Sequence, residues 1–169
     1  MRPGGSEQEA WELALAALRA RHPKVRVQPL DAHPLFGRLD RVGIRLSGLA
    51  LWNTVYLDRA LHGTALGASV LRHEGVHLDD QHRFGPLFFL SYFLPPVGPS
   101  FKAFWEWRAY RQDLLEGTPP EVIAGHFASG TYAWMWPWKG QVLRWCQRAL
   151  DRRREAELST ARRCGPGTS

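Results

Sequence analysis

Cysteine is scarce in this chain, and its scarcity excludes two kinds of stabilised fold. The two cysteines, Cys146 and Cys164, lie late in the sequence, and neither has a partner at metal-ligand spacing. We therefore expect neither a disulfide framework nor a thiolate zinc site. Long apolar runs are also missing, because the longest, residues 86–97, has about a dozen residues where a membrane span needs about twenty. The first residues lack the apolar core of a signal peptide, so the sequence favours a cytoplasmic protein.

Acidic residues are the minority charge, with 16 Asp and Glu against 22 Lys and Arg. Most of this excess lies in residues 139–169, which include the run Arg152-Arg153-Arg154. Such a segment could contact nucleic acid or an anionic membrane surface, but it is also typical of the solvated face of a last helix. The charge alone therefore does not indicate a nucleic-acid-binding protein.

Hydrophobic periodicity predicts one α+β domain over residues 6–158, with flexible ends at residues 1–5 and 159–169. A capping box of Ser6 and Glu9 opens the first helix. Strands and then only helices follow, an order without the βαβ alternation of a Rossmann-like sheet. The helices are expected at residues 6–20, 64–82, 100–117, from 118 onward and 140–158, and the strands at residues 24–28, 41–46 and 49–58.

A His-Glu-x-x-His motif at residues 73–77 carries the clearest chemistry in the sequence. On a helix His73 and His77 lie one turn apart on the same face, so both imidazoles can reach one metal ion. Glu74 lies about 100° around the helix, beside the metal, where a carboxylate can take a proton from a zinc-bound water. The motif therefore predicts a Zn²⁺ site with Glu74 as the general base.

The motif resembles that of zincin metallopeptidases, and more narrowly of gluzincins, whose third zinc ligand is a Glu on a later helix. Glu106-Trp107-Arg108-Ala109-Tyr110 matches the gluzincin Glu and the small residue three positions later, but it has Tyr where that family has Asp. The resemblance implies that Glu106 completes the metal site. It also implies a zincin-like fold, with a small sheet packed against several helices, and a peptide lying along the strand that precedes the metal helix, here Trp52 to Leu57.

Several assignments around this site stay open. His82, Asp80, Glu116, Glu121 and His126 are the alternative third ligands. The family Asp that orients a zinc histidine has Tyr110 or Asp113 as its substitute. Many gluzincins also use a His or Tyr to stabilise the developing oxyanion. For that role we rank His126 ahead of Tyr132 and Tyr110.

Two aromatic segments also admit more than one interpretation. Residues 87–94 connect the two motif helices and are either core, a substrate wall or a membrane-surface contact. Trp134, Trp136 and Trp138 alternate in a later segment and are either a substrate groove, an interfacial anchor or part of the core.

The sequence as a whole predicts a zinc-dependent hydrolase that acts on peptide bonds in a peptide or protein substrate. The first alternative is a zinc-binding scaffold or regulatory domain without activity, and the second is a basic adaptor for nucleic acid or membrane. An intact Glu74 favours the enzyme, because a purely structural zinc site needs no base and usually fills all four positions with protein.

Overall fold

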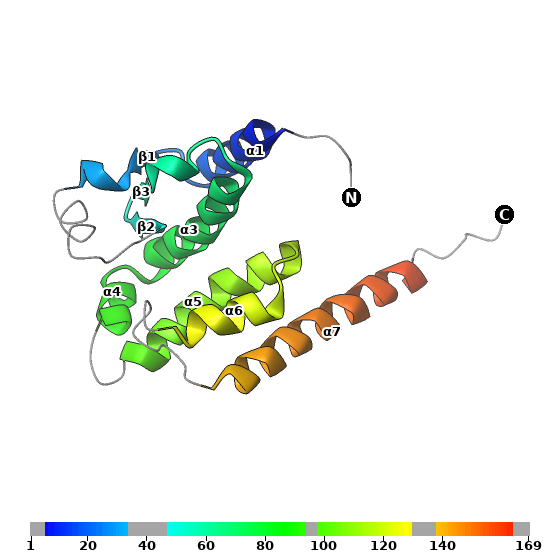
Figure 1. Ribbon diagram of the computed structural model, residues 1–169. Helices are drawn as coiled ribbons and strands as arrows, with labels where there is room; N and C mark the ends of the chain where they lie inside the picture. Colours follow the sequence, from blue (N-terminus) through cyan, green and yellow to red (C-terminus); the bar gives the residue numbers. More distant parts are fainter. Residues whose placement is uncertain (1–5, 34–46, 94–97, 130–137, 164–169) are drawn as a thin grey trace. The chain divides into compact units, whose positions relative to one another are not determined.

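The computed structural model describes residues 6–33, 47–93, 98–129 and 138–163, which form helices and a three-stranded sheet (Figure 1). The α+β class expected from the sequence is confirmed. The chain divides into two compact units, Met1–Ala109 and Tyr110–Ser169, and each is described by itself. None of the described helices is both long and apolar enough to cross a membrane.

Helix α1 (Glu7–Arg21) forms as its sequence predicts. Ser6 is the N-cap: its hydroxyl accepts from the backbone N–H of Glu9, whose carboxylate accepts from the backbone N–H of Ser6. This reciprocal pair satisfies two amide groups that a helix start otherwise leaves without partners. The buried face of α1 packs in the core of the first unit and consists of Trp11, Ala14, Leu15 and Leu18.

The sheet has the order β1–β3–β2, with β3 (Thr54–Leu57) at its centre. β1 (Arg26–Pro29) pairs with it in parallel, and β2 (Gly48–Leu51) pairs with it in antiparallel. Two short 3₁₀ helices, η1 (Leu30–Ala32) and η2 (Arg59–Leu61), follow β1 and β3. The resemblance implied a peptide lying along residues 52–57. These residues include β3, which is the central strand, and β2 is an edge of the sheet among the described strands.

The expected single strand at residues 49–58 is wrong, because the chain turns at Trp52 and Asn53 and forms a hairpin. Trp52 has a positive φ of 51°, which costs a non-glycine residue about 1 kcal/mol. Gln81 compensates from the end of helix α3: its Oε1 accepts from the Trp52 N–H at 2.7 Å, and its Nε2 donates to the Ala50 carbonyl at 2.8 Å. The turn therefore depends on a contact with residues about thirty positions away. The strand expected at residues 41–46 lies outside the described residues.

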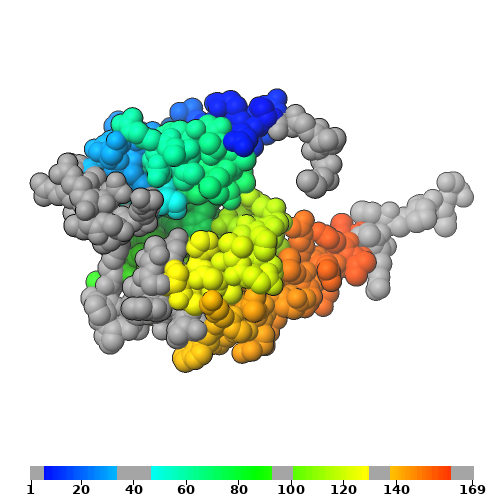
Figure 2. Space-filling view, in the orientation of Figure 1, coloured from blue at the N-terminus to red at the C-terminus, as the bar shows by residue number. Residues whose placement is uncertain are grey.

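Helix α3 (Ala65–Phe84) is the central helix of the first unit. A helix was expected at residues 64–82; Thr64 is its N-cap, and it ends at Phe84, two residues later than expected, where Gly85 has a φ of 55°. A β-carbon at Gly75 would lie 2.8 Å from the Arg21 guanidinium and 3.1 Å from Leu18. The glycine inside the motif thus allows α1 to pack directly against α3. In the space-filling view, α1 (blue) and the beginning of α3 (green) form adjoining parts of the surface (Figure 2).

Helix α4 (Pro86–Phe93) was not foreseen, and it precedes α5 (Gly98–Glu116). The apolar side chains of α4 are divided between the interior and the surface. Phe88 is buried, whereas Leu87 and Leu90 are exposed. Ser91 accepts from the Trp105 indole N–H at 2.9 Å. Among the described residues of the aromatic segment, 87–93, only part is therefore core.

The second unit holds the end of α5 together with α6 (Pro120–Phe127) and α7 (Lys139–Arg163). α6 and α7 pack on each other through buried side chains, which include Ile123, Phe127, Val142 and Cys146. Thr118-Pro119-Pro120-Glu121 predicts a capping box at the start of α6, but none forms, because Pro119 and not Thr118 is the N-cap. α7 continues to Arg163, and its side chains from Asp151 to Thr160 are exposed, as on a solvated helix face. Tyr132, Trp134, Trp136 and Cys164 lie outside the described residues.

Candidate metal centre

His73, His77 and Glu106 meet in the first unit, although Glu106 comes from a different helix. They are the group of three potential metal ligands found among the described residues, and their ligand atoms lie within 4.8 Å of one another. Glu106 Oε2 is 3.4 Å from His73 Nε2 and 3.6 Å from His77 Nε2. Glu106 and His77 are buried, and His73 is 13 % exposed, so the cluster has one more accessible side.

The dimensions of this cluster fit a zinc ion. Ligand atoms 2.0–2.2 Å from a tetrahedral ion lie about 3.3–3.6 Å apart, which matches the nitrogen-to-oxygen distances of 3.4 and 3.6 Å. Two imidazoles and one carboxylate are also a donor set that catalytic zinc sites use, with the fourth position left for water. Three protein ligands therefore match an open zinc site better than a closed, structural one.

Glu74 is buried beside the cluster and is held by the neighbouring sheet. The backbone N–H of Ala50, in β2, donates a hydrogen bond to its carboxylate. Burial raises the pKa of Glu74, and the neighbouring histidines only partly oppose this. A carboxylate with a raised pKa is better matched to proton transfer near neutral pH than an exposed one.

Gly48, at the start of β2, lies directly over this carboxylate. A β-carbon there would lie 3.0 Å from Glu74 Oε1 and 2.7 Å from Val70 Cγ1. Gly48 lies between the strands expected at residues 41–46 and 49–58, but in the structure it is the first residue of β2. Its missing side chain makes room for the base, so the edge of the sheet and the motif helix are fitted to each other.

Tyr92, on α4, holds the carboxylate oxygen of Glu106 that is not the one facing the histidines. Its hydroxyl donates to Glu106 Oε1, while Oε2 of the same carboxylate faces the two histidines. Burial would raise the pKa of Glu106, but the charges and hydrogen bonds of His77 and His73 outweigh it and hold that pKa well below its usual range. Glu106 is therefore an ionised, oriented carboxylate, which is the form that binds a metal.

Lys102 lies one turn before Glu106 on α5, with its ammonium group 5.3 Å from the centre of the Tyr92 ring. Burial lowers the pKa of Lys102, and the charge of Glu106 partly restores it. A cation thus lies beside Tyr92 and near Glu106, where its charge adds to the electrostatic stabilisation of the Glu106 carboxylate.

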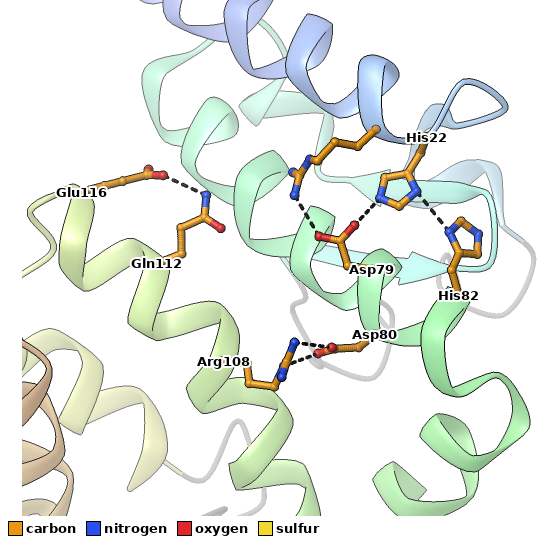
Figure 3. A network of polar contacts seen from close by, with 8 residues as sticks. His22, Asp79, Asp80, His82, Arg108, Gln112 and Glu116 are labelled. Atoms are coloured by element: carbon orange, nitrogen blue, oxygen red, sulfur yellow. Dashed lines mark hydrogen bonds and ion pairs between the residues drawn. The ribbon is translucent and has the colours of Figure 1, made fainter.

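An ion pair between Asp80 and Arg108 joins the two helices that carry the ligands (Figure 3). Arg108 Nε donates to Asp80 Oδ2 at 3.1 Å, and its NH2 group makes an ion-pair contact with Oδ1 at 2.9 Å. The Asp80 side chain is 1 % exposed and that of Arg108 is 39 % exposed. Burial raises the pKa of Asp80, with the charge of Arg108 opposing the shift. Because the cost of burying the Asp80 charge offsets much of the attraction, the intact pair contributes little net stability, but it links α3 to α5 two residues after Glu106.

Replacing Asp80 by Asn is expected to weaken zinc binding about tenfold or more while changing the melting temperature little. The amide keeps the shape but loses the charge that pairs with Arg108, so the ionic link between α3 and α5, the helices that carry the ligands, is lost; indirect changes around metal ligands typically affect affinity by this amount. Competition with a zinc chelator measures the affinity, and a thermal melt measures the stability. Asp79→Asn is the matched control, because Asp79 contacts Arg21 and His22 of α1 rather than α5. Equal zinc affinity in both variants would remove the assigned role of Asp80.

The alternative ligands are placed elsewhere or in the other unit. Asp80 contacts Arg108, and His82 contacts His22 and Asn53, so neither joins the cluster. Glu116, Glu121 and His126 belong to the second unit. There His126 is exposed, and its ring stacks on that of Tyr110 with 5.5 Å between centres. The roles predicted for His126 and Tyr110 in catalysis, and for Tyr110 or Asp113 in orienting a ligand, stay predictions.

Sequence reasoning missed Tyr92 and the Asp80–Arg108 pair. Arg108 lies inside the Glu-x-x-Ala motif, and Asp80 lies three residues after His77, so a charge pairing between the motif helices was a usable signal. Tyr92 gave a weaker signal, because its segment was not identified as a helix.

Among the described residues, His77 Nδ1 is buried without a hydrogen-bond partner.

In comparisons with known proteins, no family model, no curated protein sequence and no solved structure matches the chain significantly.

Proposed function

We propose that the protein is a zinc-dependent hydrolase of the zincin type, which cleaves peptide bonds in a peptide or protein substrate. The observation that carries the proposal is the position of Glu106. Its Oε2 lies 3.4 and 3.6 Å from the Nε2 atoms of the two motif histidines, although it comes from a separate helix. This convergence supports a metal centre more strongly than the short motif does alone.

The residues around the centre have distinct tasks in this proposal. His73, His77 and Glu106 would hold Zn²⁺, which lowers the pKa of a bound water toward neutrality. Glu74 accepts a proton from the attacking water and later gives it to the leaving amine. Ala50 holds the Glu74 carboxylate in place through its backbone N–H. Tyr92 keeps Glu106 oriented through its hydrogen bond to Oε1, and the Asp80–Arg108 pair links the two helices that carry the ligands.

An inactive zinc-binding scaffold is the second candidate, and Glu74 is the residue that separates the two. Burying a carboxylate costs free energy that an inactive site has no reason to bear. Here Glu74 is 7 % exposed, lies beside the ligand cluster and fits under a glycine of the sheet edge. These contacts favour the enzyme over the scaffold.

The proposal is tested first by metal content. Protein purified without chelator and dialysed against metal-free buffer is expected to retain close to one equivalent of zinc by elemental analysis. His73→Ala should lose that equivalent, whereas His62→Gln, which changes an exposed histidine of the same unit, should keep it. A folded wild-type protein that binds no zinc even after incubation with the ion would contradict the proposal.

A further inference from the structure

A second pair of histidines faces each other where the end of α1 meets the end of α3. His22 is the C-cap of α1, and His82 lies in the last turn of α3. Their Nδ1 atoms are 3.1 Å apart. Figure 3 shows the His22 ring between Asp79 on one side and the His82 ring on the other. His22 is 7 % exposed, whereas His82 is exposed, so the pair can be reached from solvent.

The outer nitrogen of each ring lies beside an oxygen atom. His22 Nε2 is 2.8 Å from Asp79 Oδ1, an ion-pair contact rather than a well-directed hydrogen bond, and His82 Nε2 is 3.1 Å from Asn53 Oδ1. Oxygen atoms accept hydrogen bonds, so these neighbours favour the proton on Nε2 of each neutral ring. Both Nδ1 atoms then carry a lone pair and no proton, so their approach to 3.1 Å is repulsive unless a cation lies between them.

We propose that His22 and His82 form a second metal site, which binds one divalent transition ion such as Zn²⁺ or Cu²⁺ through both Nδ1 atoms. Two nitrogens at 2.0–2.1 Å from a tetrahedral ion lie about 3.3 Å apart, close to the separation found here. Neutral imidazoles are ligands that suit zinc and copper. An oxygen acceptor on the other ring nitrogen is the usual way in which proteins orient a metal-binding histidine.

The surrounding charges allow a cation at this position. The Asp79 carboxylate also contacts the Arg21 guanidinium at 2.9 Å, so the two charges offset each other. Burial lowers the pKa of His22, although the charge of Asp79 opposes this shift. The lowered pKa keeps the His22 ring neutral at physiological pH. Water fills the remaining coordination positions on the exposed side of His82. With two protein ligands, this site binds its ion more weakly than the three-ligand centre.

The test uses the full chain with the His73→Ala change, so that the first centre is disabled. Titration with Zn²⁺ or Cu²⁺ at pH 7.5 by isothermal calorimetry is expected to show one equivalent bound. His82→Gln, added to this background, is expected to weaken that binding at least tenfold. Electron paramagnetic resonance of the Cu²⁺ form is expected to show nitrogen ligands. His62→Gln in the same background is the matched control and should leave the affinity unchanged.

Two results would overturn this second site. One is an affinity that His82→Gln does not change, which would place the ion elsewhere. The other is no binding at all, together with a histidine ring proton shared by the two Nδ1 atoms in nuclear magnetic resonance spectra. His82 is exposed, so its variant is expected to fold, and circular dichroism checks this directly. Because the first centre is already disabled, either result leaves the proposed hydrolase function unaffected.

Discussion

Hydrolysis is expected to fall by about two to four orders of magnitude when Glu74 is replaced by Gln, the scale typical of losing a general base. The amide has nearly the same shape, so it fits below Gly48 and can still accept a hydrogen bond from Ala50. It cannot accept a proton at neutral pH. Zinc content should therefore stay near the wild-type value while activity is lost. The measurement is the rate of cleavage of a peptide library, with elemental analysis of the same samples.

Glu121→Gln is the control for this experiment, because it makes the same chemical change at an exposed position of α6. It should leave both zinc content and cleavage unchanged. Equal cleavage by the wild type and by Glu74→Gln would indicate a contaminating protease or a mechanism that does not use Glu74. A variant that loses zinc as well would show instead that Glu74 supports the metal site.

The second large effect is expected from Glu106→Ala, which removes the carboxylate from the cluster. Zinc affinity should fall by more than the roughly tenfold to hundredfold loss typical of changing a group that merely orients a ligand. Tyr92→Phe provides that smaller comparison, since it removes the hydroxyl that holds Glu106 Oε1 but keeps the ring. Chelator competition ranks the three proteins, and the order wild type, Tyr92→Phe, Glu106→Ala is expected.

Glu116→Ala is the matched control on the same helix, ten positions later. It is exposed and hydrogen-bonded to Gln112, and its removal should not affect zinc binding. If Glu116→Ala weakened zinc binding as strongly as Glu106→Ala, the ligand assignment would have to move to the end of α5.

Local signals in the sequence predicted the helices well. Ser6 and Thr64 mark helix starts, and Gly85 marks an end, because each satisfies backbone groups within a few residues. The same locality explains the errors. The hairpin turn at Trp52 is stabilised by Gln81, and the helical state of residues 86–93 goes with contacts from α4 to α5, such as Ser91 with Trp105. Neither contact is visible from neighbouring residues.

The candidate site was predictable where its spacing is helical and where a family resemblance supplied the rest. His73, Glu74 and His77 follow from one helix, whereas Glu106 came from the resemblance. Contacts between elements were not predictable. Gly48 over Glu74, Tyr92 against Glu106 and Asp80 with Arg108 each depend on how two segments pack, which a single sequence does not show.

The last turn of α3 has a consequence for how the first unit loses its order. Helix ends usually fray, because their final backbone groups lack partners. Here four consecutive side chains contact other parts of the first unit: Asp79 contacts Arg21 of α1, Asp80 contacts Arg108 of α5, Gln81 binds the hairpin turn, and His82 lies beside Asn53. Local opening at this end must break all of these contacts together. Residues 79–82 thus connect several parts of the first unit. Their opening would disturb the sheet edge, helices α1 and α5 and the ligand geometry in one cooperative step.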